Sequence, residues 1–240
     1  MSSVEYDFVA IFGNLSEVEL LLLEFIAKHG LVTKSIWLTA QPLSEISPNS
    51  IASAIRNLTR RKIVVARPLH FGIFYFTFPS RSVEMLGLPP CLGKPLNEKD
   101  KLRAYARMLV FANHKPTFEQ LDKNALSERL GEPVHGFPQG FYRDTIDKTF
   151  LGFMRVDSYI QSSPDRSAQV LRNDVLRLVS VQSIVELIKR KHFEITWVTA
   201  TRHRAESVIK RFRSYDRVGS APINIIVLPE LIPLVTAIQL

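Results

Sequence analysis

The sequence contains a single cysteine, Cys91, among its 240 residues. One thiol cannot form an internal disulfide, and it cannot supply the cysteine pairs on which most structural zinc sites depend. A lone thiol is typical of a reducing compartment, so we expect a cytoplasmic protein. Its stability must come from a hydrophobic core, and 240 residues are enough for one large domain or two small ones.

Long hydrophobic runs are also absent. The most apolar stretch, residues 223–240, is divided by two prolines and by Asn224 and Glu230, whereas a membrane helix needs about 20 consecutive apolar residues. Near the start of the chain stand Glu5 and Asp7, where a signal peptide would carry lysine or arginine. The sequence therefore predicts a protein that does not enter a membrane.

Familiar catalytic and metal-binding motifs are missing as well. The six histidines show no metal-ligand spacing, and the sequence holds no glycine-rich phosphate loop and no nucleophile elbow. We therefore expect no cofactor, no metal and no catalytic residue on these grounds. What the chain has instead is positive charge: 31 Lys and Arg against 23 Asp and Glu give a net charge of +8, which favours a polyanionic partner.

Prolines and glycines gather in residues 79–96, which contain four prolines and two glycines. This composition disfavours both helix and strand, so we expect a domain junction here and predict domains over residues 1–88 and 89–240. The charge divides in the same way. Residues 1–90 hold 8 basic and 7 acidic residues, whereas residues 91–240 hold the other 23 and 16.

Local signals predict three helices and a hairpin in the first domain. Ser16 and Glu19 form a capping-box pair, Gly30 ends the first helix, and Ser47-Pro48 opens the third. The expected order is a helix from Ser16 to Gly30, a helix over residues 33–40, a helix from Ser47, and strands over residues 63–69 and 73–78. This is the order of a winged helix-turn-helix.

The third helix has the residues that a groove-reading helix requires. Ile51, Ala54, Ile55 and Leu58 form one apolar stripe. The other face and the segment that follows carry asparagine, serine and arginine, which hydrogen-bond to base edges and phosphates. The candidate DNA-binding residues are Asn49, Ser50, Ser53, Arg56, Asn57, Arg60, Arg61, Lys62 and Arg67. A solvated surface or a protein-docking module would show the same pattern.

The second domain reads as a mixed sheet covered by helices. The expected elements are helices over residues 96–113 and 116–131, strands over 141–146 and 150–159, a long helical stretch over 165–191 broken near Ser180, a strand over 193–200, a helix over 202–213 capped by Thr201, and a strand over 222–228. The fold class is therefore α+β, with a winged helix-turn-helix followed by a small α/β domain.

Two segments of this domain resemble a known family. Thr-Trp-Val-Thr-Ala-Thr-Arg-His-Arg-Ala lies in a late strand-to-helix turn, and Phe-Tyr-Arg-Asp-Thr-Ile-Asp-Lys-Thr-Phe-Leu-Gly-Phe-Met-Arg-Val-Asp spans the hairpin. Together with the N-terminal helices, they are similar to the replication-relaxation proteins and mobilisation relaxases of plasmids and mobile elements. The resemblance implies a restriction-endonuclease-like second domain.

The resemblance also implies where nuclease chemistry would lie. A nuclease of that fold has an Asp at the start of one strand and an acid, any residue and a Lys on the next, which together hold Mg²⁺ and activate water. Here Gln139 stands where the Asp would be, Arg155 stands where an acid of the next strand is expected, and no Lys follows two residues after Asp157, so we expect a degenerate site. If an activity remains, Asp144 and Asp157 are its candidates. Otherwise Asp157 is a strand-end carboxylate paired with Arg155, Arg166 or Arg172.

A second basic cluster lies near the end of the chain and comprises Arg202, Arg204, Lys210, Arg211 and Arg213. Such residues either extend a DNA footprint through phosphate contacts or form a solvated helix face. The leading hypothesis is a protein of a plasmid or mobile element that binds double-stranded DNA, with a possible homodimer, to regulate transcription or to mark an origin of replication or transfer. The alternatives are a metal-dependent nickase and a protein-docking adaptor.

Overall fold

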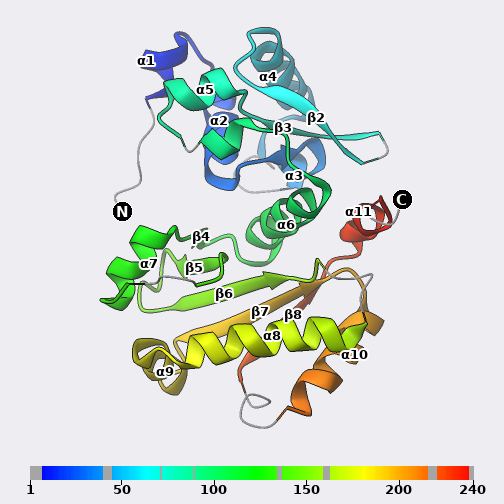
Figure 1. Cartoon of the computed structure of the whole chain (residues 1–240). Coiled ribbons are helices and arrows are strands. Elements are labelled where there is room, and N and C mark those ends of the chain that lie inside the picture. The colour runs from blue at the N-terminus through cyan, green and yellow to red at the C-terminus, as the bar shows by residue number, and fades with distance from the viewer. Residues whose placement is uncertain are drawn as a thin grey trace. The chain divides into compact units, whose positions relative to one another are not determined.

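The computed structural model describes residues 7–39, 45–70, 72–88, 90–133, 137–158, 163–215 and 221–237. The chain forms two compact units, Met1–Pro116 and Thr117–Leu240, which we call unit 1 and unit 2 (Figure 1). Both contain helices and strands, so the α+β class expected from the sequence is confirmed. The division falls at Pro116, later in the chain than the junction predicted between residues 88 and 89.

Among the residues that the structure describes, unit 1 has four helices before a β-hairpin, one more than the sequence predicted. Its elements are α1 (Phe8–Phe12), α2 (Glu17–His29), β1 (Val32–Thr33), α3 (Lys34–Thr39), α4 (Pro48–Arg60), β2 (Val65–His70), β3 (Ile73–Thr77), α5 (Ser80–Met85), η2 (Pro90–Gly93), α6 (Glu98–Leu109) and the π-helical turn η3 (Val110–His114). The strands form an antiparallel sheet in the order β1-β3-β2.

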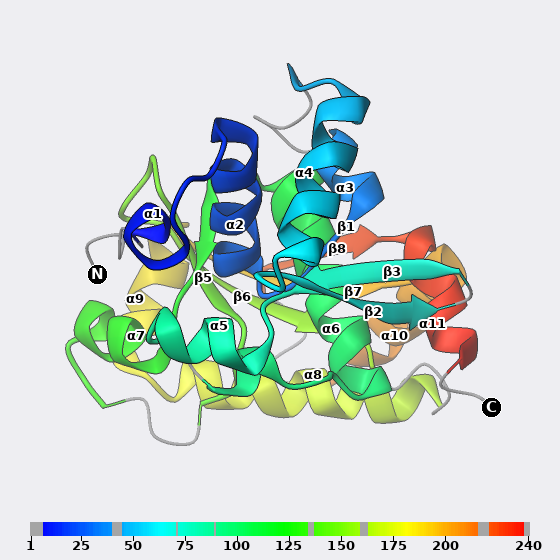
Figure 2. The ribbon, with the colours of Figure 1, turned by 90° about the horizontal axis from the view of Figure 1, so that it is seen from above.

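The helices α2 and α4 begin at the predicted capping residues, and α2 ends at the predicted glycine. Ser16 and Glu19 make the reciprocal capping-box hydrogen bonds at the start of α2, and Gly30 ends that helix with a φ of 78°, a value that glycine adopts without strain. Ser47 caps α4, with Pro48 in its first turn. These two helices contact each other (Figure 2).

The proline-rich junction is more regular than its composition suggested. Residues 79–96 include the short helix α5 and the turn η2, where we had expected neither helix nor strand. The Ser82 hydroxyl of α5 donates to the carbonyl oxygen of Ile63, which ties the segment to the start of the hairpin. Farther along, α6 contacts α2, and this packing explains why unit 1 extends beyond residue 88.

His29 occupies the last turn of α2 and packs against two aromatic rings. Its ring centroid lies 4.3 Å from that of Phe25 and 6.3 Å from that of Phe111. Burial, and secondarily the charge of Lys28, lower the pKa of His29 from 6.5 to about 3. The folded chain therefore keeps this imidazole neutral at pH values where the unfolded chain protonates it.

This lowered pKa predicts an acid-sensitive contribution to stability. As the pH falls from about 6.5 towards 3, the unfolded state binds a proton at His29 that the folded state does not, so the free energy of unfolding decreases by up to about 1.4 kcal/mol per pH unit. Urea denaturation of the wild type and His29→Phe over this range measures the effect. The difference between the two chains should change with pH, and parallel curves would contradict the prediction.

Unit 2 contains a five-stranded sheet. Its elements are β4 (Phe118–Gln120), α7 (Lys123–Leu130), β5 (Phe141–Asp144), β6 (Leu151–Val156), α8 (Pro164–Val179), α9 (Gln182–Lys189), β7 (Phe193–Thr199), α10 (Arg202–Arg213), β8 (Ile223–Val227), η4 (Pro229–Leu231) and α11 (Ile232–Ala237). The predicted break near Ser180 is confirmed, as is the Thr201 cap of α10.

One predicted helix of unit 2 is wrong in its first half. Residues 118–120 form the strand β4 rather than the beginning of a helix over 116–131, and the helix α7 starts only at Lys123. The strand forms because Phe118–Gln120 pair with β5. The Phe118 ring also meets those of Tyr142 and Phe150 edge-on, and these partners are distant in sequence.

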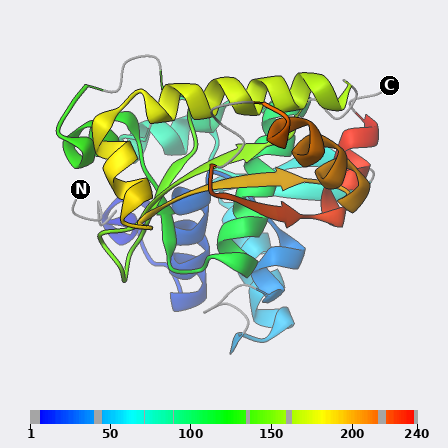
Figure 3. The same cartoon turned by 90° about the horizontal axis from the view of Figure 1, so that it is seen from below.

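The sheet has the order β4-β5-β6-β7-β8. The pairs β4–β5 and β5–β6 are antiparallel, whereas β6–β7 and β7–β8 are parallel, so the sheet is mixed as expected. The helices α8 and α10 contact each other and cover one face of this sheet (Figure 3). Leu151, Phe153, Ile195 and Trp197 supply the sheet side of that core.

Within the described ranges, no helix is both long enough and apolar enough to cross a membrane.

Candidate nucleic-acid interface

The helix α4 separates a buried stripe from an exposed polar surface. Ile51 and Leu58 are fully buried and Ala54 nearly so, while Ile55, which the sequence placed on the same stripe, is half-buried. The opposite side carries the exposed residues Asn49, Ser50, Ser53, Arg56 and Arg60 together with the half-buried Asn57. We call these six residues the α4 face.

The α4 face offers hydrogen-bond donors and positive charge without a fixed acidic partner in the helix. Arg56 and Arg60 stand one turn apart on α4, a spacing that places two side chains on the same side of a helix. The Arg60 guanidinium donates to Asn57 Oδ1 at 3.4 Å, and Ser50 Oγ lies 2.9 Å from Ser47 Oγ. An arginine that is exposed and has no acidic partner on its own helix can bind a phosphate or a guanine edge.

Two of the predicted DNA-binding arginines are instead held by the protein's own backbone. The Arg61 guanidinium donates to the carbonyl oxygen of Asn14 at 2.8 Å and to that of Phe12, so it joins the end of α4 to the segment before α2. Arg67 donates to the carbonyl oxygen of Gly93 at 3.0 Å. These contacts remove both residues from the α4 face, whereas Lys62 remains exposed just beyond α4.

The β2–β3 hairpin presents apolar rather than basic side chains. Ile73 and Phe74 are 40% and 51% exposed, and Phe74 pairs with Pro68 across the strands. Between the strands, Phe71 of the predicted turn lies outside the described residues. His70 is half-buried, and burial lowers its pKa, so the hairpin adds little positive charge beside α4.

Four of the five residues of the second basic cluster lie on the surface of α10. Arg202, Lys210, Arg211 and Arg213 of α10 are exposed. Arg202 pairs with Glu206 at 3.1 Å on the same helix, and Arg211 pairs with Asp165 of α8 at 2.9 Å. Exposed ion pairs of this kind contribute little to stability and exchange readily with other partners.

Arg204 was predicted to belong to the same basic surface, and this prediction is wrong. Its side chain is only 10% exposed. Its Nε donates to Asp157 Oδ2 at 2.9 Å, and its Nη2 donates to Ser167 Oγ at 2.7 Å. The Ser167 hydroxyl in turn donates to Asp157 Oδ1 at 2.9 Å. Asp157 is thus a strand-end carboxylate paired with an arginine, as one alternative predicted, but the arginine that the structure pairs with it is Arg204, which was not among the three proposed.

The two candidate nuclease carboxylates do not share a site. Asp144 ends β5, whose residue Arg143 pairs with Leu151 at the start of β6, whereas Asp157 follows the last residue of β6. At about 3.3 Å per strand residue, these carboxylates lie on the order of 20 Å apart. Asp144 accepts the Ile146 amide proton at 2.9 Å, and no group of three metal-ligating side chains occurs among the residues that the structure describes.

Gln139 and Arg155 stand near each other, at the place where the resemblance implies the nuclease acids. The amide of Met154 donates to the carbonyl oxygen of Gly140 at 2.8 Å, which aligns the start of β5 with the end of β6. Arg155 forms an ion pair with Asp174 of α8 at 3.3 Å, and burial raises the pKa of this Asp174. This place therefore holds a paired cation and an amide rather than two carboxylates.

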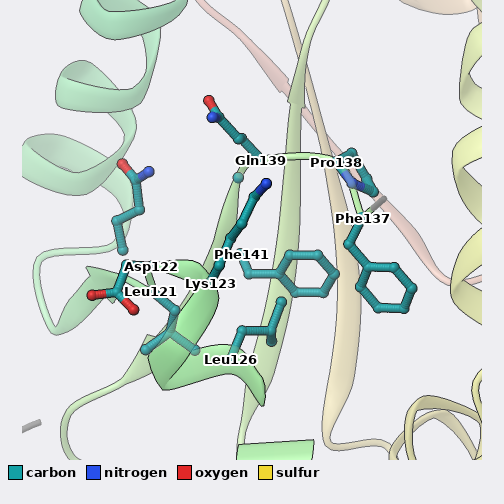
Figure 4. Close-up of a pocket in the computed structure, with 10 residues that line it drawn as sticks. Leu121, Asp122, Lys123, Leu126, Phe137, Pro138, Gln139 and Phe141 are labelled. Carbon is teal, nitrogen blue, oxygen red and sulfur yellow. The ribbon is translucent and has the colours of Figure 1, made fainter. Parts of the chain in front are cut away.

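A small pocket opens beside Gln139, between the start of β5 and α7. It encloses about 270 Å³, with Leu121, Leu126 and Phe141 as its apolar part and Asp122, Lys123 and Gln139 among its polar residues (Figure 4). The rings of Phe137 and Phe141 stack at 5.9 Å. Neither Asp144 nor Asp157 belongs to this lining.

A buried polar group in the sheet has no counterpart in the sequence predictions. The Tyr142 hydroxyl donates to Glu194 Oε1 at 2.7 Å and lies 2.7 Å from Thr196 Oγ1. Burial, and then the negative charge of Glu194, raise the pKa of Tyr142. Tyr142 reaches β7 because Gly152 of the intervening strand carries no side chain. A tyrosine and a glutamate more than 50 residues apart give no local signal.

Comparison of the chain with protein-family models, with curated proteins and with solved structures gives no match.

Proposed function

We propose that the chain is a DNA-binding protein, that unit 1 is a winged helix-turn-helix, and that α4 binds in the major groove of duplex DNA. The α4 face is the observation that carries the proposal: an exposed row of asparagine, serine and arginine opposite a fully buried stripe. The order α2, β1, α3, α4, β2, β3 supports it, because winged domains place their recognition helix directly before the hairpin. The major groove admits one such helix.

We infer for unit 2 a degenerate nuclease-like domain that extends the DNA contact or joins two copies of the chain. The mixed sheet supports this inference, as do Gln139 and Arg155 at the two positions where the resemblance implies acids. The exposed cations of α10 supply the second DNA contact. The biological role that follows is control of transcription or marking of an origin for replication or transfer on a plasmid or mobile element.

The α4 face predicts a salt-dependent loss of binding when its arginines are removed. Arg56→Ala/Arg60→Ala should weaken binding to a 30-base-pair duplex of mixed sequence by about 10- to 100-fold at 0.15 M salt. For this variant, the slope of log affinity against log salt concentration should be less steep by about 2, because each lost phosphate contact removes about 0.9 from the slope. Fluorescence anisotropy at several salt concentrations measures both quantities.

The matched control removes two exposed arginines that do not belong to α4. Arg81→Ala/Arg129→Ala changes the net charge equally, and its affinity and salt slope should stay within about twofold of the wild type. The proposal fails if the wild-type chain does not bind duplex DNA. It fails equally if the two double variants bind with the same affinity.

The hairpin favours protein docking as the second candidate function. Ile73 and Phe74 expose apolar surface where a DNA-binding wing would carry lysine or arginine, and exposed apolar patches mark protein contacts more often than nucleic-acid contacts. Ile73→Ser/Phe74→Ser distinguishes the two functions. This variant should leave DNA affinity within about twofold of the wild type if α4 binds the duplex alone.

A further inference from the structure

The strand β8 forms one edge of the five-stranded sheet. Its residues Ile223–Val227 pair with β7 in parallel register, from Ile195 opposite Ile223 to Thr199 opposite Val227. In the part of the chain that the structure describes, no further strand pairs with its outer side. Figure 3 shows β8 along the margin of the sheet, with α10 on the sheet face. The backbone donors and acceptors of an edge strand are a template for another strand.

The other sheet edges carry features that block such pairing, and β8 does not. The opposite edge of the sheet, β4, has only three residues and includes Glu119, which forms an ion pair with Arg143. The edge strand β2 of unit 1 contains Arg67 and Pro68. Charges, proline and short length are the usual protections of an edge. The sequence of β8, Ile-Asn-Ile-Ile-Val, has none of them, and Ile225 is 37% exposed.

We propose that β8 pairs antiparallel with β8 of a second copy of this chain, about a twofold axis at Ile225. The two five-stranded sheets then form one continuous sheet, and the interface is the same surface on both copies. This register sets Ile225 opposite itself, Asn224 opposite Ile226 and Ile223 opposite Val227. No charged side chain of one strand opposes a like charge of the other, so the strand is compatible with its own copy.

Charges at the two ends of β8 favour a second copy over a different partner. Since β7 and β8 are parallel, the chain returns along α10 between them, and the last turn of α10 lies towards the amino end of β8. In this turn, Arg211 lies on the side of α8, because it forms an ion pair with Asp165 of that helix. Arg213 stands on the other flank of the helix and is exposed. Glu230, also exposed, follows the carboxyl end of β8.

Antiparallel pairing brings unlike ends together. The carboxyl end of β8 in one copy, followed by Glu230, then lies beside the amino end of β8 in the other copy, the end towards which the last turn of α10, with the exposed Arg213, lies. The twofold axis makes this attraction occur twice. Complementary charge of this kind fixes the register and the choice of partner, and a copy of the same chain supplies it at both ends.

The oligomeric state of the full chain in the absence of DNA tests the proposal independently of the proposed DNA binding. Sedimentation equilibrium should give twice the chain mass of 27.3 kDa. Ile225→Lys places two like charges on the axis and should weaken the dimer at least tenfold. The control Ile146→Lys introduces the same charge at a residue that is 78% exposed in another part of unit 2, and it should remain dimeric. Circular dichroism verifies that both variants fold.

A charge exchange tests the antiparallel register. Glu230→Arg and Arg213→Glu should each weaken the dimer about three- to tenfold, and the two changes combined should restore the wild-type dissociation constant. A monomeric wild type overturns the proposal, as does a dimer that Ile225→Lys leaves unchanged. A combined variant as weak as the singles overturns the antiparallel register.

Discussion

Replacing Arg204 with methionine is expected to lower the free energy of unfolding by about 3–5 kcal/mol. The Asp157 side chain is completely buried, and its carboxylate accepts hydrogen bonds from Arg204 at 2.9 Å and from Ser167 at 2.9 Å. Methionine preserves much of the volume of arginine but leaves the carboxylate buried without its cation. The cost comes from this uncompensated charge, which low local dielectric makes large.

Arg202→Met on the same helix is the matched control. The Arg202 side chain is 88% exposed and pairs with Glu206, so its loss should change the free energy of unfolding by no more than about 0.5 kcal/mol. Urea denaturation of both variants at pH 7, followed by circular dichroism, gives the two values. Similar small losses in Arg204→Met and Arg202→Met would contradict the burial of Arg204.

A double-mutant cycle separates the ion pair from simple packing. Asp157→Leu/Arg204→Met removes both charges of this pair together, so neither member of the pair is left buried without the other. We expect the double variant to be less destabilised than the sum of the two single variants, with a coupling of at least about 1 kcal/mol. Strict additivity would show that Asp157 and Arg204 do not stabilise each other.

Local sequence signals were sufficient for the helices that begin with a capping residue. Ser16 with Glu19, Ser47 with Pro48, and Thr201 each fix a helix start through contacts within four residues. The α4 face could be predicted for the same reason. Helical spacing separates Ile51, Ala54 and Leu58 from the polar residues without any knowledge of the partner surface.

Contacts between distant residues could not be predicted in this way. Arg204 and Arg202 look alike in a basic cluster, although one is buried and the other exposed. One signal was available: Arg204 stands four residues before Val208 and eight before Phe212, and this spacing places it on the apolar stripe of α10. Its partner Asp157 lies 47 residues away, and no local pattern identifies it.

The strand β4 is a second feature that local sequence signals did not predict. The sequence around Phe118–Gln120 carries a helix-start signal, yet pairing with β5 and the ion pair between Glu119 and Arg143 favour a strand. Local preference amounts to a few tenths of a kcal/mol per residue, and tertiary pairing overrides it. The same reasoning applies to Tyr142 and Glu194, which meet only because β5, β6 and β7 are neighbours in the sheet.

Gly152→Ala is expected to lower the free energy of unfolding by about 3–5 kcal/mol, because the added methyl group has no space. A Cβ at residue 152 would lie 2.1 Å from the Tyr142 ring. The ring cannot move aside without breaking its hydroxyl contacts with Glu194 and Thr196. Overpacking costs about 1–3 kcal/mol, and a lost hydrogen bond to a charged group costs about 1.5–3 kcal/mol.

The control and the rescue distinguish this clash from the general cost of replacing a glycine. Gly131→Ala changes a glycine with a φ of 70° and no atom within 4 Å of the added carbon, so only backbone strain of about 1 kcal/mol is expected. Tyr142→Leu removes the ring that the methyl group would strike. Gly152→Ala should therefore cost less in the Tyr142→Leu background than alone, as measured by urea denaturation. If Gly152→Ala lowers the free energy of unfolding equally in both backgrounds, the requirement for glycine at residue 152 does not come from the Tyr142 ring.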